Sequence, residues 1–368
     1  MRARVCHLSS AHPTKDGRIF HKQCVSLARA GFHTSLVVPG GDDHVDCGVN
    51  ILAVPHSTGR VRRMSQTTTA VLLRAIEADA DLYQFHDPEL LGVGLALKAI
   101  GKTVIFDSHE DLPLQVAGKP WIPAPIRPAA STLVSAIDRV QARLLDAVIG
   151  ATPSIAGRFD ALGARTAVVA NYPILDEFAA PLPPWSERRQ EVVYVGGLTA
   201  MRGVETMIDG LAGMPETLVL CGPADGETQA RLDDPALGDA VQHRGMLDRP
   251  NVVQALRRAR LGLCLLERRP NYVDSMPIKL FEYLAAGLPV VASDFEPWRQ
   301  LVDGCPAVRF VPPEDIGAVR RAIRELLDDP EAAEARGVEG RRLVFERFAW
   351  ATQAETLIGL YRELGLMP

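Results

Sequence analysis

The feature that most constrains this chain is a repeated alternation of short β-rich segments with helical segments. The first series includes strands predicted at Val5–Leu8, Leu82–Phe85 and Thr103–Asp107, and a second series includes Val192–Val195 and Leu261–Leu266. Strands that alternate with helices indicate a mainly parallel, doubly wound α/β sheet. We therefore expect two such domains, which face each other across a cleft at the carboxyl ends of their strands.

The length and one lapse in the pattern predict where the domains meet. A chain of 368 residues suits two domains of ordinary size. Between the two series the alternation stops at a stretch with three prolines and several charged residues. This stretch predicts an exposed linker at 176–190, between an N-terminal domain at 1–175 and a C-terminal domain at 191–348. A final helix at 349–368 is expected to pack back on the N-terminal domain.

Composition excludes several classes of protein. The formal net charge is −5, so no bulk positive field attracts nucleic acid. The six cysteines are scattered without a Cys-x-x-Cys pair, which argues against zinc fingers and a disulfide framework. We see no signal peptide, and the apolar runs are far shorter than the roughly 20 residues of a membrane span. We expect a cytoplasmic protein, soluble or bound to a membrane surface.

A glycine-rich turn in the second series is a candidate phosphate site. The strand at Val192–Val195 continues into Gly196 and Gly197, and a helix is expected to begin near Arg202. Glycines let backbone N–H groups approach a ligand, and a helix N-terminus adds unpaired N–H donors. The helix dipole disfavours a cation at Arg202 unless an anion is bound, so we interpret the turn as a pyrophosphate site. A plain turn with a solvated arginine is the alternative; the G-x-G-x-x-G pattern of dehydrogenases is not present.

A second candidate is the helix predicted to begin at Pro277. Lys279 and Glu282 lie three residues apart, so they share one face of this helix, and Leu280 covers the core side. An ionised Glu282 can accept two hydrogen bonds from a vicinal diol such as a ribose. From the residues alone, a surface ion pair between Lys279 and Glu282, with Asp274 as a mere helix cap, is the alternative.

Polar side chains also follow three strands of the first series. Carboxyl ends of parallel strands are where open α/β sheets bind ligands, and an imidazole there can hydrogen-bond a sugar hydroxyl or a phosphate. Structural histidines and a solvated first loop are the alternatives. The candidates are His12, Asp16 and Gly17 in the first loop, His86 after the second of these strands, and His109 and Glu110 after the third.

Taken in this order, these segments resemble a retaining glycosyltransferase of family 4 with the GT-B fold, over nearly the whole chain. The stretches Asp16–Lys22, Phe85–Leu91 and Asp107–Pro113 resemble signatures of a bacterial subgroup associated with surface polysaccharide assembly. Pro277–Tyr283, followed by Ala285–Val291, resembles the donor-site helix of the family. The resemblance implies an α/β, GT-B architecture with two Rossmann-like domains that face each other across a cleft.

The resemblance also implies roles in donor binding. Glu282 matches the acidic residue that binds the ribose hydroxyls, and Asp274 stands where the family has a glutamate against the donor sugar. Arg202 matches a basic residue that binds the pyrophosphate. A second basic residue of the family corresponds to Gly197 in this chain, and Lys279 is our candidate substitute for it. Arg244 and Met246 belong to a stretch that resembles the family's strand near the nucleobase. The implied donor-binding set is Gly196, Gly197, Arg202, Arg244, Met246, Asp274, Lys279, Leu280 and Glu282.

The same resemblance implies a catalytic set and an acceptor region. His109 matches a histidine near the transferred sugar. No metal ligand and no cofactor are implied, because basic side chains and helix N-terminal amides would stabilise the departing nucleoside diphosphate. The implied catalytic set is His109, Asp274, Arg202 and Lys279, and the implied acceptor or cleft set is His12, Asp16, Gly17, His86 and Glu110.

The function expected from the resemblance is metal-independent, retaining transfer of a hexosyl-type sugar. The donor would be a UDP or GDP sugar, and the acceptor a lipid-linked glycan in bacterial exopolysaccharide or lipopolysaccharide assembly. The alternatives are a sugar-nucleotide epimerase of similar fold, and a non-catalytic relative that binds a nucleotide sugar. The non-catalytic alternative arises because Gly197 and Asp274 stand where the family has a basic residue and a glutamate.

A basic segment and a proline-rich loop suggest peripheral membrane contact at the inner face of the plasma membrane. Arg60, Arg62 and Arg63 precede an apolar helical segment, as contact with anionic lipid requires. Trp121 lies among prolines, where it suits an interface. Solvated arginines and a packed tryptophan are the equally simple alternative.

Overall fold

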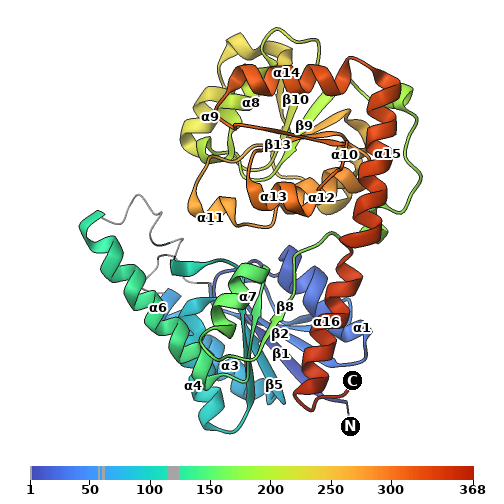
Figure 1. Cartoon of the computed structure of the whole chain (residues 1–368). Helices are drawn as coiled ribbons and strands as arrows, with labels where there is room; N and C mark the ends of the chain where they lie inside the picture. Colours follow the sequence, from blue (N-terminus) through green and yellow to red (C-terminus); the bar gives the residue numbers. More distant parts are fainter. Residues whose placement is uncertain (1, 57–58, 60–62, 114–115, 117–123) are drawn as a thin grey trace. The chain divides into compact units, whose positions relative to one another are not determined.

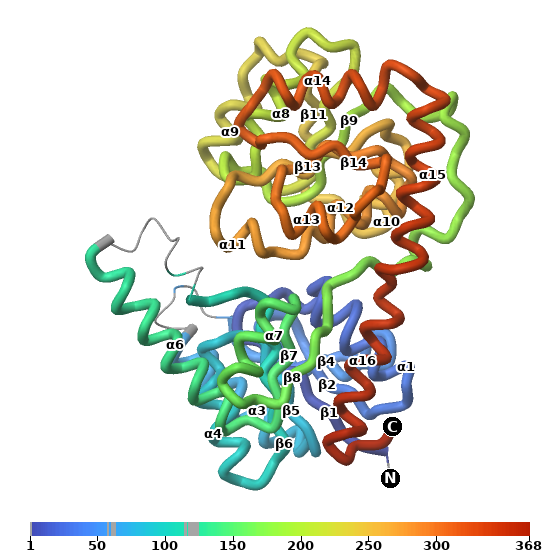
Figure 2. Tube along the Cα trace, viewed as in Figure 1, coloured from blue at the N-terminus to red at the C-terminus, as the bar shows by residue number. Residues whose placement is uncertain are grey.

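The computed structural model describes residues 2–56, 59, 63–113, 116 and 124–368. The chain divides into two compact units (Figure 1, Figure 2). Unit 1 comprises Met1–Asn171 and Trp350–Pro368, and unit 2 comprises Tyr172–Ala349. Within the described residues, no helix combines the length and the apolar composition that a membrane crossing requires.

Unit 1 contains a doubly wound sheet of eight strands. In chain order the strands are β1 (Arg4–Leu8), β2 (His33–Pro39), β3 (His44–Asp46), β4 (Val49–Val54), β5 (Leu82–Phe85), β6 (Thr103–Ser108), β7 (Ala147–Gly150) and β8 (Thr166–Val168). Their order across the sheet is β3-β4-β2-β1-β5-β6-β7-β8, and every pair is parallel except β3 with β4. The winding direction reverses between β1 and β5, which is the position where open α/β sheets bind ligands.

Helices cover both faces of this sheet. Apolar residues of α3, α4 and α7 pack on one face, while those of the π-helical segment η1 and of α1 pack on the other. The last helix, α16, also belongs to unit 1. The bounds are η1 (Gly17–Cys24), α1 (Val25–Arg29), η2 (Arg63–Thr67), α3 (Thr68–Ala78), η3 (Pro88–Leu90), α4 (Leu91–Ala99), η4 (Ala124–Ile126), α6 (Arg127–Leu144), α7 (Pro153–Asp160) and α16 (Trp350–Glu363).

Unit 2 contains a parallel sheet of six strands in the order β11-β10-β9-β12-β13-β14. The winding reverses between β9 and β12, so this sheet is doubly wound as well. The confirmed fold class is therefore α/β, with a doubly wound sheet in each unit. The strands are β9 (Glu191–Val195), β10 (Thr217–Cys221), β11 (Val241–His243), β12 (Leu261–Cys264), β13 (Val290–Ser293) and β14 (Val308–Val311).

The helices of unit 2 also lie on both faces of its sheet. One buried cluster joins the sheet to α10, α12, α13 and α15, and another joins it to α8 and α14. The bounds are η5 (Leu175–Phe178), η6 (Trp185–Glu187), η7 (Ala200–Arg202), α8 (Val204–Leu211), α9 (Gly226–Leu232), η8 (Pro235–Ala240), α10 (Arg249–Arg258), α11 (Pro270–Val273), α12 (Ile278–Ala285), α13 (Glu296–Leu301), α14 (Ile316–Leu327) and α15 (Pro330–Arg347).

The stretch 176–190, expected to be an exposed linker, is instead part of unit 2. Phe178, Trp185 and Arg188 are buried there. The Arg188 guanidinium donates to the carbonyl oxygens of Ala259 at 2.9 Å and Ala286 at 3.0 Å. Prolines therefore mark irregular backbone here, while an aromatic ring and a buried guanidinium hold the segment against the unit.

The segment after Ala349 packs on unit 1 through hydrogen bonds at both of its ends. The Trp350 indole N–H donates to Ser26 Oγ at 2.9 Å, and Ala170 N–H donates to Gln353 Oε1 at 2.7 Å. Near the other end, Ala3 N–H donates to the Met367 carbonyl at 3.1 Å. Tyr361 is fully buried between these contacts.

Two glycines close to each other in unit 1 provide a matched test of this packing. An added Cβ at Gly150 would lie 2.5 Å from the Ala156 backbone nitrogen, whereas Gly157 has open space around it in α7. We expect Gly150→Ala to destabilise unit 1 by about 2–4 kcal/mol. Gly157→Ala should stabilise it by up to about 1 kcal/mol because alanine favours the helix. Urea unfolding of both variants measures this, and equal effects would contradict the close approach of α7 to β7.

Candidate functional site

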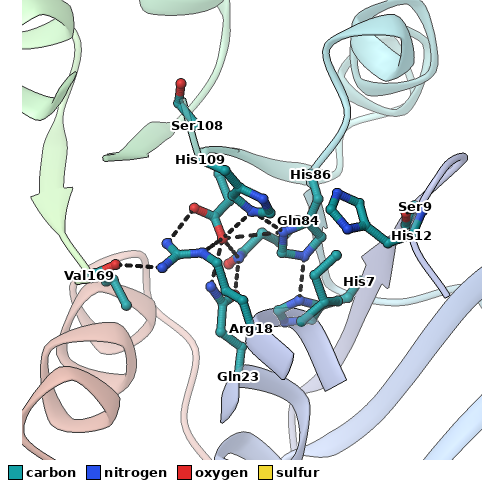
Figure 3. Close-up of polar contacts among 12 residues, drawn as sticks. His7, Ser9, His12, Arg18, Gln23, Gln84, His86, Ser108, His109 and Val169 are labelled. Atoms are coloured by element: carbon teal, nitrogen blue, oxygen red, sulfur yellow. Dashed lines mark hydrogen bonds and ion pairs between the residues drawn. The ribbon is translucent and has the colours of Figure 1, made fainter. Parts of the chain in front are cut away.

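The first candidate site lies at the carboxyl ends of β1, β5 and β6, where unit 1 changes its winding direction (Figure 3). Its anchor is Asp107, which is fully buried near the end of β6. The Arg18 guanidinium donates to both carboxylate oxygens, at 2.7 and 3.2 Å, and to the Val169 carbonyl at 2.8 Å. The Gln23 amide donates to Asp107 Oδ2 at 2.6 Å. Burial opposes ionisation, but Arg18 and His109 hold the pKa of Asp107 well below its usual range.

Three histidine rings form a continuous chain of contacts, and two of them, His86 and His109, contact this carboxylate. His86 Nδ1 lies 3.2 Å from Asp107 Oδ2 and 3.1 Å from His109 Nε2. On the opposite side of its ring, His86 Nε2 lies 2.9 Å from His7 Nδ1, a contact marked by a dashed line in Figure 3, and the two ring planes differ by 23°. Burial lowers the pKa of His86 to about 4 and that of His7 well below its usual value, so both rings are neutral at neutral pH.

A fourth histidine belongs to the first loop. His12 Nδ1 lies 3.2 Å from Asp16 Oδ2, and its Nε2 lies 3.5 Å from Asp87 Oδ1. Burial opposes protonation, yet the hydrogen bond to Asp16 and the charge of Asp87 raise the pKa of His12. Asp16 also caps η1, because its Oδ1 accepts from the backbone N–H groups of Arg18 and Ile19 at 2.8 Å.

The structure therefore brings together four of the residues that the sequence suggested for this region, His12, Asp16, His86 and His109. Gly17 follows Asp16 directly as the first residue of η1, with open space beyond its Cα, and Glu110 is exposed. His7, Arg18 and Tyr361 were missed. Of these, only His7 had a local signal, as a polar residue inside a strand predicted to be buried.

The cluster of His86, Asp107 and His109 also has spacing that suits a metal ion. Its three ligand atoms lie within 4.8 Å of one another. However, Arg18 already neutralises Asp107, so a dication would add buried positive charge with no counter-charge. The only Asp-x-Asp in the sequence is elsewhere in unit 1: Asp79 pairs with Arg4 and Lys102, and Asp81 accepts from the Arg4 backbone N–H. Hydrogen bonding explains this cluster better than metal binding.

The second candidate site is the glycine turn after β9 in unit 2. Gly196 has a φ of +141°, and an added Cβ would lie 2.5 Å from Lys279 Cε. Any larger residue at this position would therefore clash with the Lys279 side chain. Lys279 Nζ lies 5.0 Å from the centre of the Tyr194 ring. Burial, together with the nearby Arg202, lowers the pKa of Lys279 to about 8. Among the described residues, neither Arg202 nor Lys279 forms an ion pair with a carboxylate, so the turn holds two cations that an anion would stabilise.

Glu282 has a different partner from the one expected. Its Oε1 lies 2.7 Å from Arg249 Nη2 at the start of α10, and Arg249 also contacts Glu177 Oε2 at 2.6 Å. The surface pair of Glu282 with Lys279 is therefore not formed, because α10 places a guanidinium closer. Arg249 was missed, since nothing in the local pattern distinguishes it from a solvated arginine.

The other predicted donor residues have different surroundings. Arg244 donates to Glu191 Oε1 at 2.8 Å, Met246 is exposed, and Leu280 is buried in the core. Asp274 does not cap the helix, which was the alternative for this residue: it ends α11, and α12 begins only at Ile278. Gly197 has no atom within 4 Å of an added Cβ, so there is room for a larger side chain.

The helix expected to start near Arg202 begins two residues later. Arg202 lies in the 3₁₀ turn η7, and Gly203, with a φ of +71°, leads into α8 at Val204. An added Cβ at Gly203 would lie 2.9 Å from the Leu265 carbonyl oxygen, which explains glycine at this point. Arg202 therefore lies beside the N-terminus of α8 and contacts the Tyr272 ring, 5.7 Å from its centre.

Two family models match this chain. The model described as "Glycosyl transferase 4-like domain" matches residues 17–172, and "Glycosyl transferases group 1" matches residues 189–329. The chain is 27% identical to the alpha-D-kanosaminyltransferase of Streptomyces kanamyceticus, over 48% of this chain and 47% of that protein. It is 24% identical to the phosphatidyl-myo-inositol mannosyltransferase of Mycolicibacterium smegmatis, over 91% and 86%. The chain spans about half the length of most curated relatives it matches.

Solved structures share the fold over the whole chain. The sucrose-phosphate synthase of Thermosynechococcus elongatus superposes with a TM-score of 0.79 at 20% identity, over 99% of both chains. The HepE protein of Anabaena, solved with UDP and glucose, superposes with a TM-score of 0.73 at 15% identity, over 98% of this chain and 100% of that one.

The pKa shifts of His12 and His86 have opposite signs, and NMR can measure both. We expect His86 to stay neutral from pH 6.5 down to about 4, and His12 to keep its proton above pH 6.5. Titration of ¹⁵N-histidine-labelled protein, assigned with single variants, measures both. Because the unfolded chain protonates the His86 position first, this group makes the unfolding free energy fall as the pH drops from 6.5 towards 4. A His86 midpoint near 6.5 would contradict its burial.

Proposed function

We propose that this chain, which belongs to the glycosyltransferases of the GT-B fold, transfers a hexosyl-type sugar from a nucleoside diphosphate sugar to a glycan acceptor, with retention of configuration. The observation that carries the proposal is the pair of cations at the glycine turn of unit 2. Among the described residues, Arg202 and Lys279 have no carboxylate in an ion pair; Arg202 lies just before the N-terminus of α8, and Lys279 lies against Gly196. A pyrophosphate supplies the missing negative charge.

Unit 2 would hold the donor nucleotide. Arg202, Lys279 and the amides near Gly196 and Gly197 would bind its pyrophosphate. Glu282, oriented by Arg249, would accept hydrogen bonds from the ribose hydroxyls. The HepE protein, whose fold this chain shares, is solved with UDP and glucose, so UDP is the first donor nucleotide to test. GDP is the second.

The reaction separates charge as the nucleoside diphosphate leaves. Arg202 and Lys279 would stabilise the negative charge that develops on its leaving oxygen, and in this proposal no metal is required for that step. The acceptor hydroxyl attacks the anomeric carbon on the face from which the diphosphate departs, the old C–O bond breaks and the hydroxyl proton passes to the leaving group. His109 would orient a hydroxyl of the transferred sugar by a hydrogen bond, so no nucleophile from the protein is needed.

We place the acceptor on a lipid-linked glycan at the cytoplasmic face of the plasma membrane, in surface polysaccharide assembly. One relative is named for the mannosylation of phosphatidyl-myo-inositol, a lipid. Of the residues proposed for membrane contact, Arg60, Arg62 and Trp121 lie outside the described residues, as does the side chain of Arg63. We expect substitution of the three arginines by alanine to weaken the binding of the protein to anionic vesicles, and a vesicle-binding assay measures this. Unchanged binding would contradict the membrane contact.

Lys279 makes donor binding depend on pH. Because its pKa is lowered to about 8, the affinity for UDP should fall above pH 8, by up to about tenfold per pH unit. Lys279→Met should weaken binding by roughly ten- to a hundredfold and abolish this dependence. Calorimetric titration with UDP and GDP, with EDTA and again with magnesium, measures both effects. Arg309→Met, which removes a surface pair with Glu325, is the control; failure of every nucleotide to bind would refute the donor site.

His109→Ala separates binding from turnover. We expect this variant to bind the nucleotide as the wild type does, and to lose at least about tenfold in transfer and in slow donor hydrolysis, because one hydrogen bond to the sugar is absent. Chromatographic detection of released nucleoside diphosphate measures hydrolysis without an acceptor. Equal loss of nucleotide binding would contradict the role of His109. Conversion of the donor into an epimeric nucleotide sugar, with no diphosphate released, would favour an epimerase.

A further inference from the structure

We propose that His7 and Tyr361 are positioning residues for His109. Through a buried chain of hydrogen bonds they keep the His109 proton on Nε2, so that Nδ1 is the acceptor offered to a substrate hydroxyl. The inference rests on the proposed function, because it concerns how the candidate catalytic histidine meets its substrate. His7 lies in β1 and Tyr361 in α16, and both are fully buried, so they act through the histidine between them, His86.

The chain of hydrogen bonds begins at Asp107, whose ionised carboxylate can only accept hydrogen bonds. The Gln23 amide nitrogen donates to Asp107 Oδ2 at 2.6 Å, which leaves Gln23 Oε1 as an acceptor. Gln84 Nε2 donates to that oxygen at 2.5 Å and lies 3.4 Å from the same carboxylate oxygen. Both amides are therefore oriented by Asp107, and Gln84 Oε1 must face away from it.

This orientation decides where the Tyr361 proton points. Tyr361 Oη lies 2.8 Å from Gln84 Oε1, and since that oxygen can only accept, the hydroxyl donates to it. Burial raises the pKa of Tyr361, so the hydroxyl keeps its single proton. The remaining contact of Tyr361 Oη, 3.2 Å from His7 Nε2, must then be a hydrogen bond that the ring nitrogen donates. His7 consequently carries its proton on Nε2.

The proton positions on His86 and His109 follow from the proton position on His7. His7 is neutral, so its Nδ1 is an acceptor, and His86 Nε2 donates to it at 2.9 Å. His86 is neutral as well, so its Nδ1 has no proton. Among the described residues, that nitrogen faces Asp107 Oδ2, which cannot donate, and His109 Nε2 at 3.1 Å. The proton between them therefore belongs to His109 Nε2, which also lies 3.2 Å from Asp107 Oδ2.

The consequence is a defined chemical face on His109. With Nε2 turned towards His86 and Asp107, Nδ1 is the one acceptor nitrogen that a neutral His109 ring presents elsewhere. The side chain is 18% exposed, in contrast to the fully buried His86 and Asp107 behind it. An acceptor of this kind suits a sugar hydroxyl that donates to it.

Loss of the Tyr361 hydroxyl would remove the reason for this proton order. His7 Nε2 would have no acceptor, so the His7 proton could move to Nδ1 and donate to His86. His86 would then carry its proton on Nδ1 and donate to Asp107, so it would no longer accept from His109 Nε2, and Asp107 Oδ2 alone would hold the His109 proton there. In Tyr361→Phe, His109 should therefore populate both tautomers rather than one.

The first experiment uses the free wild-type protein, labelled with ¹⁵N-histidine. Two-bond ¹H–¹⁵N correlation spectra distinguish the two tautomers, and single histidine variants assign the signals among the nine histidines. At a pH where the rings are neutral, we expect the proton on Nε2 in His7, His86 and His109. A wild-type His109 that carries its proton on Nδ1 would overturn the proposal, whatever the variants do.

The second experiment compares Tyr361→Phe with Tyr83→Phe. Tyr83 is also buried in unit 1, where its hydroxyl donates to the Ala75 carbonyl and accepts from Ala80 N–H, so its loss is a matched structural change. We expect Tyr361→Phe alone to give mixed His109 tautomers and a kcat for donor hydrolysis lower by roughly three- to tenfold, with an unchanged KM. Equal effects of the two variants on tautomer and kcat would show a merely structural role.

The spectra need no substrate, so the two proposals can fail separately. Absence of nucleotide binding and turnover with the predicted wild-type tautomers would refute the proposed function and leave the proton order established. Turnover with the opposite His109 tautomer would support the proposed function and overturn this inference.

Discussion

The buried ion pair between Arg18 and Asp107 is the interaction on which unit 1 depends. Burial of two charges is costly, and it is offset here because every oxygen of the carboxylate accepts hydrogen bonds from Arg18, Gln23 or a neighbouring ring. Arg18 also binds the Val169 carbonyl, so the pair joins η1, β6 and the chain beyond β8. Removal of either partner would leave an uncompensated charge in the interior.

Unit 2 has the opposite electrostatic arrangement at its glycine turn. There the positive groups Arg202 and Lys279 lie close enough for one to lower the pKa of the other. Such repulsion costs stability in the free protein and is relieved when an anion binds, which is typical of a site built for a charged ligand. The buried charges of Arg18 and Asp107 thus neutralise each other, whereas among the described residues no carboxylate forms an ion pair with Arg202 or Lys279.

The fold could be predicted from the sequence because β-rich and helical periodicities are local. The strands β1, β5 and β6 were expected close to where they occur, and with them the positions of His86 and His109. The linker predicted at 176–190 was wrong because proline content indicates backbone shape and not exposure. The alternative that Asp274 caps the helix was wrong because α11 intervenes. Side-chain partners were beyond the pattern: Tyr361 and His7 are 354 residues apart. A histidine and a glutamine inside otherwise apolar strands were the one local sign of a buried polar network.

The return of the chain to unit 1 affects how the protein is made. A ribosome synthesises residues 1–171 first, but the tyrosine that closes the interior of that unit is at position 361. During translation the first unit must therefore wait, with part of its interior open to water, while the whole of unit 2 is synthesised and folds. Nascent chains stalled before α16 should for this reason expose apolar surface to chaperones, although all the strands of both sheets are already present.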